Sequence, residues 1–205
     1  MQRMVAFIDF IGTTDARAAG TADAMLQNFW HYAESWANRD EVRAAVPDAQ
    51  VAGTDDYERP EVEVATVSDS LVLLTPTEYT LESFFALAIH LQKYLQDKAQ
   101  LRCYCIVSRG NEIVRPDVGY ITSGSSIEHP AYRHIVGVGT AWADMMKADL
   151  QIDERNKKDW GHRYTLYTVG ITEAELPHTF RKADELTFKS KWGGATVRVL
   201  ALLPA

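Results

Sequence analysis

The sequence has few cysteines and no long apolar run. Two cysteines in 205 residues exclude a disulfide-rich scaffold. Cys103 and Cys105 stand two apart in a strand-like run, so both would point to one face, which is poor geometry for a mutual disulfide. A CxC pair without a second cysteine cluster is also a weak metal signal, and we interpret both as small buried apolar side chains. No apolar run approaches the roughly 20 residues that cross a bilayer. Residues 1–12 contain Asp9 and no small-residue cleavage site, unlike a signal peptide. We therefore expect a cytoplasmic protein.

Basic residues are fewer than acidic residues in this sequence. The chain has 21 Lys and Arg against 28 Asp and Glu, a formal net charge of −7. A surface of that sign repels phosphate backbones, which disfavours sequence-independent nucleic-acid binding. With 46% hydrophobic and 24% charged residues, the composition is that of an ordinary globular protein. We predict one domain over residues 1–205.

Apolar periodicity predicts a mixture of strands and helices. We expect strands at residues 4–11, 62–67, 71–74, 101–107, 118–121, 164–169 and 196–203, and helices from 22 until before 47, at 81–98, and from about 139 to 150. Thr21 and Thr80 are the expected N-caps, and residues 47–60 and 123–126 are expected to be loops. This order predicts an α+β domain with helices on one face of a largely antiparallel sheet. The other face would need a cover, for which a second subunit is the simplest candidate.

Two carboxylates interrupt apolar strand-like runs. Asp9 lies within AFIDFIG and Asp69 within ATVSDSLVLL. An ionised carboxylate in an apolar strand is costly unless it is paired or holds a cation. If the two strands are neighbours, the acids converge, and Mg²⁺ or Mn²⁺ would relieve their repulsion. Taken singly, Asp69 is explained by turn chemistry and Asp9 by the end of its strand.

The segment after Asp9 is a candidate phosphate loop. Gly12, Thr13 and Thr14 could present backbone N–H groups to a phosphate, with the next helix start adding a positive field. A plain turn explains the single glycine equally well.

These residues resemble a known family. FIDFIG followed by VSDSLVLL looks like the paired metal-binding motifs of class III nucleotidyl cyclases. SRG at residues 108–110 and GVGTAWADMM at residues 137–146 are similar to the pyrimidine cyclases of the bacterial Pycsar antiviral defense system. The resemblance extends over the order of elements along roughly the whole chain, and its specific motifs are short.

The resemblance implies a ferredoxin-like class III cyclase domain that forms a head-to-tail homodimer, with active sites at the interface. It implies that Asp9 and Asp69 bind two Mn²⁺ or Mg²⁺ ions, with the backbone carbonyl of Phe10 as a further metal ligand. Residues Phe10, Ile11, Gly12, Thr13 and Thr14 would hold the triphosphate. The implied reaction is attack of the ribose O3′ on the α-phosphorus, giving a 3′,5′-cyclic nucleotide and pyrophosphate.

The sequence departs from the adenylyl cyclase pattern at several positions. Ala65 stands where those enzymes have an adenine-reading lysine. Those enzymes have an Asn and an Arg on a helix that stabilise the transition state. In one alignment of the glycine motif before this helix, these positions fall on Ala141 and Met145, and in the other alignment they fall on Ala143 and Lys147. Only Lys147 could replace the charge, and it is our third catalytic candidate.

Base and phosphate contacts are expected from residues 101–107 and from a late basic turn. Arg102 and Tyr104 share the face opposite to the core, where arginine can fork two hydrogen bonds and tyrosine can stack or donate. An interface salt bridge for Arg102 and simple packing for Tyr104 are equally acceptable. Lys189 and Lys191 resemble the triphosphate-binding lysine turn of adenylyl cyclases, and Lys191 is the candidate that we keep. An exposed solvated turn is the alternative.

The resulting hypothesis is a pyrimidine nucleotide cyclase that makes cyclic UMP from UTP, or cyclic CMP from CTP, for a separate effector protein in antiphage defence. Nothing in the sequence separates a uracil O4 acceptor from a cytosine N4 donor. A catalytically silent cyclase-homology module that binds nucleotide or dimerises is the alternative. A two-metal nuclease or phosphohydrolase would need more acids and histidines near the metals, and its polynucleotide substrate suits the −7 charge badly.

Overall fold

A computed structural model gives the structure of the chain. It describes residues 2–12, 18–44, 46, 48–67, 70–75, 77–111, 140–156, 163–190 and 194–205. Several predictions fall outside these residues, namely the strand at 118–121, the loop at 123–126, and the site residues Thr13, Thr14, Asp69 and Lys191.

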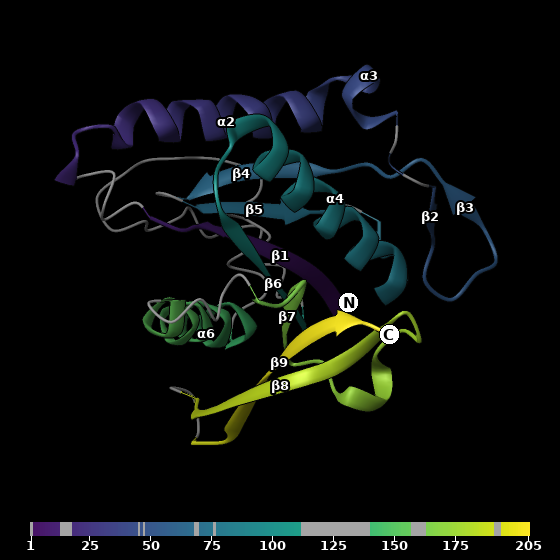
Figure 1. Ribbon diagram of the computed structural model, residues 1–205. Coiled ribbons are helices and arrows are strands. Elements are labelled where there is room, and N and C mark those ends of the chain that lie inside the picture. Colours follow the sequence, from purple (N-terminus) through teal and green to yellow (C-terminus); the bar gives the residue numbers. More distant parts are fainter. Residues whose placement is uncertain are drawn as a thin grey trace, which may run out of the picture.

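A seven-stranded sheet runs through the molecule in the order β4-β5-β1-β6-β7-β9-β8 (Figure 1). The strands are β1 (Gln2–Phe10), β4 (Glu63–Val67), β5 (Ser70–Leu74), β6 (Cys103–Asn111), β7 (Leu166–Val169), β8 (Phe180–Lys189) and β9 (Thr196–Pro204). Every pairing is antiparallel except that of β6 with β7. The predicted α+β fold with a largely antiparallel sheet is therefore confirmed. Strands β4 and β5, which follow each other in the sequence, pair antiparallel.

One face of the sheet packs against α2 (Ala22–Asn38) and α4 (Leu81–Ala99), which lie side by side (Figure 1). The even-numbered residues of β1 point to this face, and Phe10 stacks on Phe29 of α2 with ring centroids 5.8 Å apart. Helix α4 begins where predicted because the Thr80 hydroxyl accepts a hydrogen bond from the Ser83 backbone N–H at 3.3 Å. It ends at Gln100, which has a left-handed φ of 55°.

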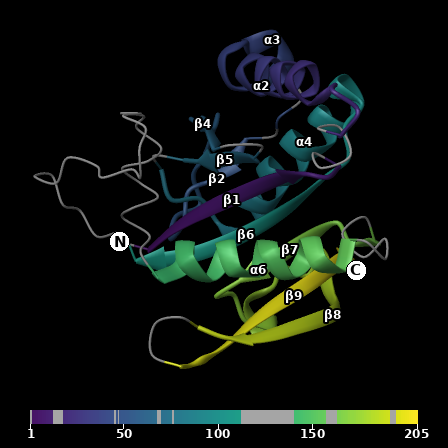
Figure 2. The same cartoon turned by 90° about the vertical axis from the view of Figure 1, so that its left-hand side faces the viewer.

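The opposite face packs against α6 (Thr140–Asn156), which crosses over β6 and β7 (Figure 2). Its buried residues Met145, Ala148 and Ile152 meet the odd-numbered residues of β1 and the even-numbered residues of β6. The expectation that helices cover only one face is therefore corrected. The helix was predicted, but apolar periodicity does not say on which side of a sheet a helix packs. Leu150, an apolar residue of the same helix, is 63% exposed.

Other elements differ from the prediction. Strand β8 was missed, because its sequence FRKADELTFK mixes charged residues with helix-favouring ones. It lies at the edge of the sheet, where one side of the strand meets solvent. The expected loop at 47–60 contains a two-stranded pair, β2 (Ala49–Gln50) with β3 (Tyr57–Glu58). Helix α2 ends earlier than expected and is followed by the short α3 (Asp40–Arg43), while η1 (Glu173–Glu175) follows β7.

Both cysteines are free and buried, in agreement with the sequence analysis. Within the described ranges, no helix is long and apolar enough to cross a bilayer.

Candidate functional site

Asp9 lies near the end of β1, between the two strands that pair with β1. In the register of the sheet it faces Ser70 of β5 on one side and Tyr104 of β6 on the other. Residues opposite each other in neighbouring strands point to the same face, here the face covered by α6. The fold therefore gathers a carboxylate and two hydroxyl groups from three strands.

The Asp9 carboxylate is held at both oxygens. The Ser70 hydroxyl donates to Oδ1 at 2.5 Å, and the Tyr104 hydroxyl lies 3.1 Å from Oδ2. Ser70 and Tyr104 are both buried, whereas Asp9 is partly exposed. Two partners of fixed position define the orientation of the carboxylate.

A second acid, Asp149 of α6, reaches the same tyrosine. The Tyr104 hydroxyl lies 2.6 Å from Asp149 Oδ1, and Asp149 is 9% exposed. Burial, and next the negative charges of Asp9 and Asp149, raise the pKa of Tyr104 far above its ordinary value of 10, so the phenol stays protonated. Asp149 was missed by the sequence analysis. The available signal was an acid beside Ala148 on the apolar stripe of a helix.

Of the roles considered for Tyr104, simple packing fits the position of its ring, and stacking on a base does not. Its ring is fully buried and meets Tyr167 edge-on, with centroids 6.1 Å apart. The face of the sheet to which the Tyr104 side chain points is covered by α6, so a base could not reach the ring. Arg102 precedes β6 and is exposed, so its guanidinium remains a candidate for contact with a ligand.

The segment after Asp9 is brought close to the carboxylate by the chain itself. The ring of Phe10 is buried on the other face of the sheet, so Phe10 can offer a ligand only its backbone. The Ile11 N–H donates to the carbonyl of Arg102 at 2.8 Å, and is therefore unavailable to a phosphate. Gly12 has a φ of +103°, a conformation that favours glycine, and a Cβ there would meet no atom within 4 Å.

Lys147 lies on the flank of α6 toward β8. Its ammonium group donates to the carbonyl of Lys189 and lies 5.0 Å from the centroid of the Phe188 ring. Met145, which stands where arginine would be in the other register, is fully buried in the core under α6. The structure thus brings Lys147 to Lys189, the neighbour of the basic turn.

No family model matches the sequence, and no curated protein matches it. Solved structures do match. The guanylyl cyclase Cya2 aligns with 98% of this chain and 91% of its own at 9% identity, with a TM-score of 0.52. The adenylyl cyclase CyaB from P. aeruginosa aligns with 100% of this chain and 94% of its own at 10% identity, with a TM-score of 0.53.

The fold is that of the class III cyclases. A bacterial light-regulated adenylyl cyclase also matches 98% of this chain, at 9% identity and a TM-score of 0.53. This chain spans 52% of that longer protein. At the level of the fold, these matches support the resemblance to class III nucleotidyl cyclases.

Within this cyclase fold, the donors around Asp9 suit a hard divalent cation. The described groups are two carboxylates and two hydroxyls, all of them oxygen donors, which Mg²⁺ and Mn²⁺ prefer over nitrogen or sulfur. The described residues contain no group of three or more His, Cys, Asp or Glu side chains close enough to hold a metal alone. Asp69, the second predicted ligand, directly precedes Ser70 in the sequence and lies outside the described residues.

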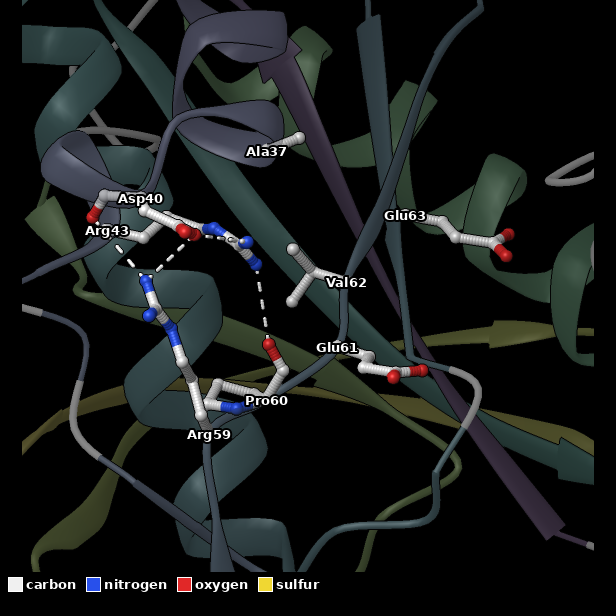
Figure 3. A pocket seen from close by; sticks show the side chains of 8 residues that line it. All are labelled: Ala37, Asp40, Arg43, Arg59, Pro60, Glu61, Val62 and Glu63. Carbon is white, nitrogen blue, oxygen red and sulfur yellow. Dashed lines mark hydrogen bonds and ion pairs between the residues drawn. The ribbon is translucent and has the colours of Figure 1, made fainter.

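A surface pocket of the cyclase fold lies elsewhere, beside α3 and the chain that leads into β4 (Figure 3). Asp40 accepts ion pairs from Arg59 at 3.0 Å and from Arg43 at 3.5 Å, while Arg43 also donates to the carbonyl of Pro60 at 3.4 Å. Asp40 is 76% exposed, so these pairs are screened by solvent and contribute little to stability. Glu61 and Glu63 also line the pocket. With more acids than basic groups, the pocket is a poor site for a triphosphate.

Proposed function

We propose that this protein is a pyrimidine nucleotide cyclase that converts UTP or CTP to the 3′,5′-cyclic monophosphate and pyrophosphate. One observation carries the proposal: a partly exposed carboxylate, Asp9, held at both oxygens near the end of β1, an interior strand of a class III cyclase fold. The match to the adenylyl cyclase CyaB covers 100% of this chain.

The residues around Asp9 have distinct roles in this proposal. Asp9 and Asp69 would bind two Mn²⁺ or Mg²⁺ ions, with the Phe10 carbonyl as a further ligand. The bound ions would lower the pKa of the ribose 3′-hydroxyl and neutralise phosphate charge. The chain from Phe10 to Thr14 would hold the triphosphate through its backbone, without the Ile11 N–H, which already has a partner.

The reaction itself is a single displacement. The ribose O3′ forms a bond to the α-phosphorus as the bond between that phosphorus and the bridging oxygen breaks, and pyrophosphate leaves with the electron pair. The hydroxyl proton passes to solvent. Lys147, Lys191 and Arg102 are the candidate cations for the phosphate charge, and the pairing of Lys147 with the Lys189 carbonyl brings it to the end of β8 where the basic turn begins.

A pyrimidine base is proposed because Ala65 occupies the position of the adenine-reading lysine of adenylyl cyclases. The finer features of the proposal rest on the same resemblance. They are a head-to-tail homodimer in the cytoplasm, and a cyclic UMP or cyclic CMP signal read by a separate effector during antiviral defence.

A catalytically silent nucleotide-binding module is the second candidate. It is favoured by Met145, an apolar side chain buried in the core at one of the two registers for the transition-state arginine. The ordered hydrogen bonds at Asp9 favour the enzyme, because a silent domain has no need to orient a partly exposed carboxylate.

The decisive experiment incubates the purified protein with Mn²⁺ and each of the four ribonucleoside triphosphates, and separates the products by chromatography. We expect a cyclic pyrimidine nucleotide and an equal amount of pyrophosphate. Asp9→Ala and Asp69→Ala should abolish turnover while the dimer persists in light scattering. Absence of any cyclic product would favour the silent module, and a cyclic purine product would overturn the pyrimidine assignment.

A further inference from the structure

We propose that a small cavity between α4, the start of β6 and the residues before β7 is a second ligand site, which binds a small phosphate-bearing anion. The cavity has a volume of about 230 Å³. Cys103 lines it and belongs to the core under α2 and α4, whereas the Asp9 side chain points to the face covered by α6. The cavity is therefore separate from the candidate active site, and the inference goes beyond the proposed function.

The cavity lies where two neighbouring strands do not begin together. Strand β6 begins at Cys103, whereas its pairing with β7 begins at Ile106. At this end of β6, side chains of α4 satisfy the backbone: the Cys103 carbonyl accepts hydrogen bonds from Gln92 Nε2 at 3.1 Å and from Gln96 Nε2 at 3.0 Å. Residues four apart lie on the same face of a helix, so the two amides stand together at the wall of the cavity.

Gln92 supplies a buried polar group to this wall. It is 7% exposed, and its bond to the Cys103 carbonyl fixes the amide in place. A primary amide carries two N–H groups and an acceptor oxygen, so this one bond leaves Gln92 a donor and an acceptor for a ligand. Among the residues that the structure describes, its side chain has no other hydrogen-bond partner.

The charge of the cavity is positive. Lys93 and Arg163 line it, and none of the described lining residues is acidic. Both cations are exposed, and neither forms an ion pair with another described residue. A guanidinium group forks two hydrogen bonds to a phosphate, and an ammonium group adds a compact charge. Two positive charges match a phosphate monoester, which carries about −1.5 to −2 at neutral pH.

The size of the cavity limits the ligand. A water molecule takes about 30 Å³ of liquid volume, so the cavity has room for about seven waters. This room suits a phosphate group with a short organic chain, and it is smaller than the pockets of roughly 300 Å³ or more that hold drug-sized ligands. Ile89 and Tyr164 give the organic part an apolar wall. The ligand class is therefore the small phosphate monoesters, whose phosphate group is shared by inorganic phosphate.

The test titrates the full chain with inorganic phosphate and with glycerol 3-phosphate, and follows amide signals by ¹H–¹⁵N nuclear magnetic resonance. We expect the side-chain NH₂ signals of Gln92 and Gln96 to shift with both probes. The double variant Lys93→Gln/Arg163→Gln should weaken binding at least tenfold. Gln96→Glu should weaken it as strongly, because it adds a negative charge to the cavity while Gln92 still holds the Cys103 carbonyl. Tighter binding of glycerol 3-phosphate would identify an ester as the ligand, and tighter binding of phosphate would identify the free ion.

Matched controls change the same charges at exposed positions elsewhere. The double variant Lys98→Gln/Arg181→Gln removes one lysine and one arginine charge, and Gln27→Glu adds one negative charge on α2. Both controls should bind the two probes as the wild type does. Circular dichroism checks folding, which the exposed positions of Lys93 and Arg163 should leave intact.

Several results would overturn the inference. They are equal affinities in the two double variants, a wild type that binds neither probe, and succinate binding as tightly as glycerol 3-phosphate. Binding that is lost in Lys147→Ala but kept in Lys93→Gln/Arg163→Gln would assign the phosphate to the candidate active site and would also overturn it. Because this readout needs no turnover, failure to make a cyclic nucleotide would remove the proposed function and leave the phosphate site standing.

Discussion

Ser70 and Asp9 face each other across β5 and β1, and the serine hydroxyl donates to the carboxylate at 2.5 Å. The bond lies at the end of the strand pair, directly after the connection from β4. We predict that Ser70→Ala lowers the free energy of unfolding by about 1.5–3 kcal/mol, the range for a hydrogen bond to a charged group. Urea unfolding followed by tryptophan fluorescence measures the change.

The control for this prediction is a double-mutant cycle. In an Asp9→Ala background the acceptor is absent, so Ser70→Ala should lower the free energy of unfolding much less than it does in the wild type. An equal cost in both backgrounds would show that Ser70 acts through packing and not through Asp9.

Cys103 and Cys105 provide a probe of unfolding. Burial raises the pKa of the Cys103 thiol to about 12, with a further contribution from the charge of Asp9, and burial raises that of Cys105 well above its ordinary value. Since the thiolate is the reactive form, neither should react with a disulfide reagent at pH 8 in the native protein. Two equivalents of the reagent should react once the chain is unfolded in guanidinium, because both cysteines are then exposed and the sequence has no other cysteine. Rapid labelling of the native protein would contradict the buried position of β6.

The sequence was sufficient for those parts of the site in which a residue conflicts with its local pattern. Asp9 was found because a carboxylate interrupts an apolar strand, and the start of α4 was found because Thr80 precedes an apolar stripe. Asp149 was missed because acids on an amphipathic helix are usually solvated, and only the packing of α6 on the sheet buries this one. The sequence left the role of Tyr104 open for the same reason: strand alternation gave the face of the sheet to which Tyr104 points, but not what covers that face.

Glu175 is predicted to stabilise the protein against acid. The Thr172 hydroxyl and backbone N–H, and next Arg109 of β6, lower the pKa of Glu175 to about 2. A carboxyl whose pKa falls on folding stabilises the protein above its unfolded pKa of about 4.5, and this contribution is lost as the pH falls toward 2. Glu175→Gln should therefore destabilise the protein at pH 7 and lose that effect below pH 3, as measured by urea unfolding. Glu154→Gln, at an exposed position on α6, should show no such difference between the two pH values.

The Trp36–His90 pair predicts a second pH dependence, near neutrality. The buried indole of Trp36 donates to His90 Nδ1 at 2.9 Å, so this nitrogen must be unprotonated in the folded protein. Burial, and next the charge of Lys93, lower the pKa of His90 below its ordinary value of 6.5. The unfolded chain therefore takes up the proton first as the pH falls below 6.5, and stability declines from there down to the folded pKa. In His90→Asn, an amide oxygen replaces the Nδ1 acceptor and does not titrate, so the decline in unfolding free energy between pH 7.5 and 5.5 should be smaller than in the wild type. His178→Asn, at an exposed position, should keep the wild-type decline, and an unchanged decline in His90→Asn would assign the pH dependence to another group.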